Sequence, residues 1–121
     1  MLRRNRSILL LLIFVEACAT GAPEWRGIYN PVSEVCAGQV LTIDTATVSY
    51  ADCKNAGMKV LTQSDREFSF QVSPEAKCMA KSFVFSLSPQ GSDVDVTLFR
   101  SAKDKAAKIP VIECTYTRQK K

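Results

Sequence analysis

The feature that most limits the fold of this chain is a strict alternation of apolar and polar residues. Phe68, Phe70 and Val72 alternate with polar neighbours, which predicts a strand with one buried and one exposed face. Adding the other segments with the same pattern gives eight short predicted strands, near 25–29, 41–43, 48–50, 58–62, 67–72, 82–88, 93–98 and 112–117. The segment 102–108 fits either one helical turn or a polar hairpin loop.

Residues that favour turns separate most of these runs. They are Asp44-Thr45, Asn55-Ala56-Gly57, Ser64-Asp65-Arg66, Ser73-Pro74-Glu75 and Pro89-Gln90-Gly91-Ser92. Short connections between consecutive strands favour a meander, and closing the sheet removes exposed strand edges. We therefore predict an all-β fold, a small antiparallel eight-stranded barrel with two disulfides. The alternative is a two-sheet β-sandwich.

The amino terminus has the layout of a secretory signal. Three arginines in the first six residues precede the apolar run 8–15, and small residues follow from Ala17. Eight apolar residues are too few to cross a bilayer, which takes about 20. The arginine-rich start and the short apolar run therefore predict export of the chain.

The end of this leader, Val15-Glu16-Ala17-Cys18, resembles the lipobox of bacterial lipoproteins. The resemblance implies that residues 1–17 are a signal peptide, that Cys18 is the lipid attachment site and that 18–24 is a lipidated tether to a single β-domain, 25–121. With Ala19 next to Cys18, it also implies anchoring in a bacterial outer membrane, facing the periplasm. The alternative is cleavage after Ala19, which would leave a soluble periplasmic or secreted protein without lipid.

Four of the five cysteines remain after Cys18 is lipidated or removed, and an even set suits disulfides in the oxidising periplasm. If Asp44-Thr45 is a two-residue hairpin loop, Leu41 faces Val48 on one apolar face. Continued outward, that register sets two cysteines opposite each other. We therefore predict the pairs Cys36–Cys53 and, by remainder, Cys78–Cys114.

The sequence offers little for catalysis. It has no histidine, which excludes Ser-His-Asp and Cys-His arrangements and imidazole metal ligands, and it has no Cys-x-x-Cys pair for zinc. Asp93 and Asp95 share one face of a predicted strand, but it is the polar face, where carboxylates serve solubility. We predict no enzymatic activity, no catalytic residue, no cofactor and no metal site.

Recognition is the remaining class of function. Without residues 1–17 the chain carries 13 basic and 11 acidic residues, a balance that does not indicate a nucleic-acid partner. Loops on a rigid scaffold are the usual contact sites. The candidates are the first loop, with Tyr29, Asn30 and Glu34, and the basic stretch with Lys103, Lys105 and Lys108.

The expected partner is a periplasmic or cell-surface protein, with a membrane contact through the lipid anchor. The protein would then be a protein-binding module: an inhibitor, an immunity protein or an accessory subunit of an envelope machine. In size and β-architecture the chain is similar to the lysozyme-inhibitor lipoproteins, although their Ser-Gly-x-x-Tyr loop is not found in it.

The opening Trp25-Arg26-Gly27-Ile28-Tyr29 resembles the first strand of lipocalin-like barrels. The resemblance implies that Trp25 closes one end of the barrel, and it suggests the alternative function of a carrier for a small apolar ligand. We rank the carrier second, because four bulky residues are expected to point inward and fill a barrel of this size: Phe68, Phe70, Phe83 and Phe85.

Overall fold

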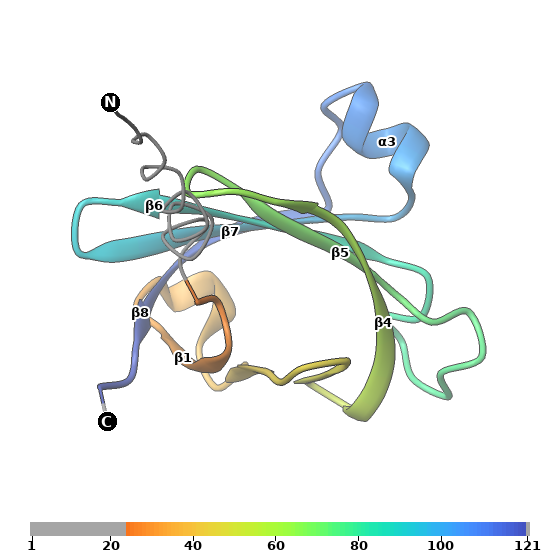
Figure 1. Cartoon of the computed structure of the whole chain (residues 1–121), viewed down its shortest axis with the longest axis horizontal. Coiled ribbons are helices and arrows are strands. Elements are labelled where there is room, and N and C mark those ends of the chain that lie inside the picture. The colour runs from red at the N-terminus through yellow and green to blue at the C-terminus, as the bar shows by residue number, and fades with distance from the viewer. Residues whose placement is uncertain (1–23, 121) are drawn as a thin grey trace, which may run out of the picture.

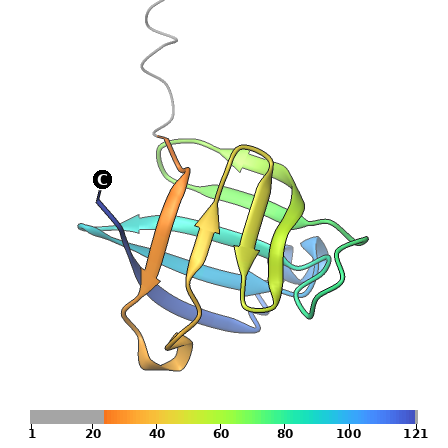
Figure 2. The same ribbon diagram turned by 90° about the horizontal axis from the view of Figure 1, so that it is seen from below.

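A computed structural model describes residues 24–120 of the protein. The predicted signal peptide 1–17, the candidate lipid site Cys18 and all of the tether except Glu24 lie outside the described residues. The described chain forms a closed antiparallel barrel in which each strand pairs with the next and the last pairs with the first (Figures 1 and 2). Its strands are β1 (Gly27–Pro31), β2 (Leu41–Ile43), β3 (Thr47–Tyr50), β4 (Cys53–Gln63), β5 (Phe68–Val72), β6 (Val84–Gln90), β7 (Asp93–Phe99) and β8 (Ile112–Arg118).

The closed barrel confirms the predicted fold, and the alternative, a two-sheet β-sandwich, is not formed. All eight predicted strands are present. One predicted turn is wrong: Asn55-Ala56-Gly57 lies inside the long strand β4, and the chain turns earlier, at Ala51-Asp52. Asn55 has a positive φ of 49°, next to a register shift between β3 and β4. A residue that favours turns thus accommodates a local irregularity within a strand.

Aromatic side chains pack inside the barrel. The Phe70 and Phe85 rings stack with their centroids 4.9 Å apart, and Tyr50 meets Phe85 edge-on at 5.1 Å. The largest fully buried side chains include Tyr29, Leu41, Phe70, Phe85, Leu87 and Tyr116. The expected filling of the interior is confirmed for Phe68, Phe70 and Phe85, whereas Phe83 precedes β6 and is only half-buried against the core.

The register between β2 and β3 differs from the predicted one. Leu41 faces Tyr50, and Ile43 faces Val48, so the turn centres on Thr45-Ala46. The backbone N–H of Asp44 donates to the Thr47 carbonyl oxygen at 2.9 Å. Because the two registers differ by two residues, both bury the same side chains, and the apolar pattern alone does not distinguish them.

The cysteine pairs are Cys36–Cys114 and Cys53–Cys78, so all four predicted cysteines form disulfides but both predicted pairings are wrong. Cys36 does not lie on an extension of β2. It is the last residue of a short 3-10 helix, η2 (Glu34–Cys36), in the connection between β1 and β2. This position brings the Cys36 sulfur within bonding distance of Cys114 on β8.

The alternating strands sort the connections into two ends of the barrel. The end that we call the loop end carries the connections 32–40, 51–52, 73–83 and 100–111. The end that we call the terminal end carries 44–46, 64–67 and 91–92, together with the first and last described residues. In Figure 2 the described chain starts at the top, while the connection from β1 to β2 lies at the bottom.

The last loop-end connection contains a short helix, α3 (Ala102–Ala106), which projects from the barrel wall (Figure 1). Of the two sequence expectations for 102–108, the helical turn is the one observed. Ser101 caps the helix, because its hydroxyl accepts a hydrogen bond from the Asp104 N–H at 3.1 Å.

Candidate functional site

Exposed hydrophobic side chains gather at the loop end. Nine large ones are exposed among residues 24–120, and six of these lie on loop-end connections: Val32, Val35, Val40, Met79, Ile109 and Val111. Met79 is the most exposed of the nine, at 83%. Single exposed hydrophobic residues are ordinary, but a group of them on one surface marks a candidate contact site.

A cavity of about 410 Å³ opens among these connections. Six side chains give it an apolar lining: Met79, Ala80, Phe83, Leu98, Val111 and Ile112. Two exposed residues of opposite charge, Asp52 and Arg100, also line it. We call this cavity the apolar groove. Its volume falls within the range of pockets that hold a ligand or a partner's side chain.

The segment that carries Met79 is attached to the barrel at Met79 itself and at the preceding residue, Cys78. Both carboxylate oxygens of Asp52 accept from the Met79 backbone N–H, at 3.2 Å each, and the neighbouring Cys78 is bonded to Cys53. The next residue, Ala80, is buried. The Met79 side chain is therefore exposed on a backbone that is held in place.

The first loop-end connection is attached in the same way. Cys36 is bonded to Cys114, the Val32 backbone N–H donates to the Thr115 carbonyl oxygen at 2.8 Å, and the Ser33 hydroxyl accepts from the Thr115 N–H at 2.8 Å. Both disulfides therefore brace long connections of the loop end. A surface held in one conformation loses less entropy when it binds a partner.

The predicted first-loop residues differ in how far the structure exposes them. Tyr29 is a correction: its side chain is fully buried, and its hydroxyl donates to the Trp25 carbonyl oxygen at 2.6 Å. Tyr29 lies in the middle of β1, which continues to Pro31, and it occupies an inward-facing position of the strand. Its ring is therefore unavailable to a partner. Asn30 is half-buried on β1, and Glu34 is exposed on η2 at the loop end.

The predicted basic residues lie on the connection 100–111. Lys103 and Lys108 are exposed. Lys105 instead forms an ion pair at 3.1 Å with Glu67, which belongs to the terminal-end connection 64–67, and so holds α3 against the barrel wall. Burial raises the pKa of Glu67, but a hydrogen bond from the Ser86 hydroxyl and the nearby Lys105 ammonium outweigh this and lower the pKa.

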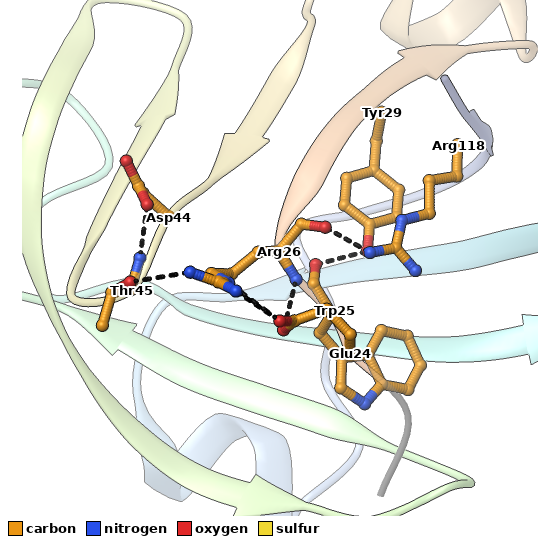
Figure 3. Close-up of polar contacts among 7 residues, drawn as sticks. All are labelled: Glu24, Trp25, Arg26, Tyr29, Asp44, Thr45 and Arg118. Carbon is orange, nitrogen blue, oxygen red and sulfur yellow. Dashed lines mark hydrogen bonds and ion pairs between the residues drawn. The ribbon is translucent and has the colours of Figure 1, made fainter. Parts of the chain in front are cut away.

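The terminal end is closed by its own side chains (Figure 3). Trp25 is buried, its ring stacks on Phe68 at 5.8 Å, and its indole N–H donates to the Ser64 carbonyl oxygen at 3.1 Å. This is the position at a barrel end that the sequence suggested for Trp25. A cavity of about 240 Å³ remains beside the Trp25 ring.

Polar groups at the rim of that cavity are largely engaged with one another. The Arg26 guanidinium contacts the Glu24 carboxylate at 2.7 Å and donates to the Thr45 hydroxyl at 3.3 Å (Figure 3). The hydrogen bond from Arg26 lowers the pKa of Glu24. These contacts join the start of the described chain to the turn between β2 and β3.

Arg118 joins β8 to β1 where the barrel closes. Its guanidinium donates to the Arg26 carbonyl oxygen and lies over the Tyr29 ring, 5.6 Å from the centroid (Figure 3). Gly27, with φ of 152°, leaves room for it, because a Cβ at this position would lie 3.0 Å from the Arg118 Nε. The buried and paired side chains of the terminal end thus serve the closure of the barrel.

One cluster among the described residues has the composition of a metal site: Asp52, Cys53 and Cys78. Its two sulfur atoms are joined in a disulfide and are not free thiolates. The Asp52 carboxylate is already used by the Met79 N–H. The cluster is therefore explained as part of the loop attachment.

No protein-family model, no curated protein and no solved structure matches this chain. None of the helices in the described part of the chain is long and apolar enough to cross a membrane. The candidate site consequently depends on the geometry of the loop end alone.

Proposed function

We propose that this protein is a small envelope lipoprotein that acts as a protein-binding module and contacts its partner through the loop end. The observation that supports this is the placement of six of the nine exposed large hydrophobic side chains on the connections of the loop end, two of which, Met79 and Val111, line the apolar groove. Interfaces of soluble proteins are commonly built around such exposed apolar residues.

The position of the tether supports the same proposal. The described chain begins at the terminal end, so a lipid on Cys18 would hold that end next to the membrane and turn the loop end away from it. Two disulfides suit a protein that folds outside the cytoplasm. The proposed location is the outer membrane, facing the periplasm, with a soluble periplasmic or secreted form as the alternative.

The proposed partner is a periplasmic or cell-surface protein, and the module would act on it as an inhibitor, an immunity protein or an accessory subunit. The carrier alternative has less support. Aromatic and aliphatic side chains occupy the inside of the barrel, among them Phe70, Phe85 and Leu87 with no exposed surface.

Affinity recovery from envelope extracts tests the proposal. The wild-type protein is compared with Val111→Glu, which places a charge in the apolar groove, and with Leu61→Glu, which alters a side chain of similar exposure on β4. Proteins recovered by the wild type and by Leu61→Glu should be lost with Val111→Glu. Equal recovery with all three, or no specific recovery, would refute a loop-end contact.

A further inference from the structure

The connections that border the apolar groove carry more positive charge than the rest of the described protein. The three connections that border it, 51–52, 73–83 and 100–111, carry six basic and three acidic residues, whereas the other described residues carry six basic and eight acidic ones. Neither ion pair found among residues 24–120 involves Arg100, Lys77, Lys81, Lys103 or Lys108. These five cations are therefore available to an anionic partner.

The acidic residues of the same connections are partly engaged. Both oxygens of Asp52 accept from the Met79 N–H, and Glu75 accepts from the Ser73 hydroxyl at 3.0 Å. Arg100 both lines the apolar groove and is exposed. A group that enters the groove thus meets an apolar lining with the Arg100 guanidinium beside it, while the Asp52 carboxylate, which also lines the groove, accepts from the Met79 N–H.

From this geometry we infer that the partner inserts an apolar side chain of an acidic polypeptide segment into the groove. The inference rests on the proposed function and names the chemistry of the partner. The apolar lining would take the side chain, while Arg100, which lines the groove, and the exposed lysines of the bordering connections would contact flanking carboxylates. Complementary charge of this kind speeds association and selects against basic partners.

An anionic membrane surface is the other partner that cations and apolar residues can bind. Two observations favour the polypeptide. The groove is concave, and one of the connections that border it, 73–83, is held in place by the Cys53–Cys78 disulfide, which suits an inserted side chain better than a flat lipid surface. The loop end also lies opposite the start of the described chain, which would turn it away from the protein's own membrane.

The probe is a phage-displayed library of random linear peptides, selected on the purified mature protein in detergent. Enriched sequences should carry an apolar residue flanked by Asp or Glu. A synthetic peptide of the enriched sequence should bind Val111→Glu and Arg100→Glu about tenfold more weakly than the wild type. Binding to the controls Leu61→Glu and Lys59→Glu should stay within about twofold. Circular dichroism confirms that each variant is folded.

Three results would overturn the inference: no enrichment, enrichment of neutral or basic sequences, or binding that is equally sensitive to the control variants. Vesicles of phosphatidylcholine, with and without an equal amount of phosphatidylglycerol, test the membrane alternative. Binding to the anionic vesicles that Arg100→Glu abolishes would assign the surface to lipid. Recovery of a partner from envelope extracts can depend on Val111 even when the selected peptides are not acidic. In that case the proposed function stands, and only the inference of an acidic partner segment is refuted.

Discussion

The Asp52 carboxylate accepts a hydrogen bond from the backbone N–H of Met79, directly beside the Cys53–Cys78 disulfide. This contact joins the turn between β3 and β4 to the connection between β5 and β6. The most exposed large hydrophobic side chain of the described protein is thereby carried on a fixed backbone. We attribute to this pair and its neighbouring disulfide the fixed position of the connection 73–83.

Removing the carboxylate should loosen this connection. We expect Asp52→Ala to lower the free energy of local opening at the Met79 amide by about 1 kcal/mol, the typical net value of one hydrogen bond. Hydrogen exchange at Met79 measures it. Asp65→Ala, in the turn between β4 and β5, serves as the control and should leave the exchange unchanged; protection of Met79 that survives Asp52→Ala would contradict the assigned contact.

Met79 should matter little for stability. Because its side chain is 83% exposed, Met79→Ala should change the free energy of unfolding by no more than about 0.5 kcal/mol. Phe70→Ala removes a fully buried ring and should cost about 3–5 kcal/mol. Urea unfolding compares the two, and a large loss with Met79→Ala would show that this side chain serves the core.

The two disulfides should differ in their contribution to stability. Cys36–Cys114 links residues 78 apart and Cys53–Cys78 links residues 25 apart. In the chain-entropy model they contribute about 4.5 and about 3.5 kcal/mol. We expect the double variant Cys36→Ala/Cys114→Ala to be the less stable of the two double variants in urea unfolding. Non-reducing peptide mapping should give the same pairs, and a Cys36–Cys53 peptide would contradict the structure.

Glu67 should add a pH dependence to stability. Its pKa in the folded state lies below the ordinary value of 4.5, so the folded protein binds this proton less readily than the unfolded chain. Its stabilising contribution is complete above about pH 4.5 and is lost as the pH falls through the lower folded-state pKa. Acid unfolding should therefore be less steep in Glu67→Gln than in the wild type over this range.

Lys105→Met tests the same prediction through the other member of the ion pair. It removes the cation that lowers the Glu67 pKa and leaves the carboxyl in place, so the pH dependence should shrink in this variant as well. Identical acid unfolding of all three proteins would mean that the Glu67–Lys105 pair does not act in solution.

The alternating pattern predicted the strands and their inward faces, because one-sided burial requires a period of two. It did not predict the register of β2 with β3, since a shift of two residues buries the same side chains. The position of Cys36 on a 3-10 helix depends on the path of a connection, which leaves no periodic signal. Both predicted disulfide pairs failed for these reasons.

The candidate site was only partly predictable. The basic stretch at 103–108 was identified from charge, but the ion pair of Lys105 with Glu67 depends on tertiary contacts. Tyr29 stands where the predicted strand 25–29 meets the first loop, and it was counted among the contact residues, although the two-residue period that begins at Trp25 places it inside. Met79 was missed because a single methionine in a polar connection gives no periodic signal that would indicate whether its side chain is buried or exposed. Its one signal was its place beside a cysteine in a connection between strands.

A crosslinking scan in the cells that make the protein tests the central claim most directly. A photoreactive amino acid replaces, one at a time, the loop-end residues Val35, Met79 and Val111 and the control residues Ile28 and Leu61, which are exposed away from the loop end. We expect a discrete adduct with another protein from the loop-end positions and none from the controls. Adducts from the control positions alone, or equal adducts from both sets, would contradict a loop-end binding surface.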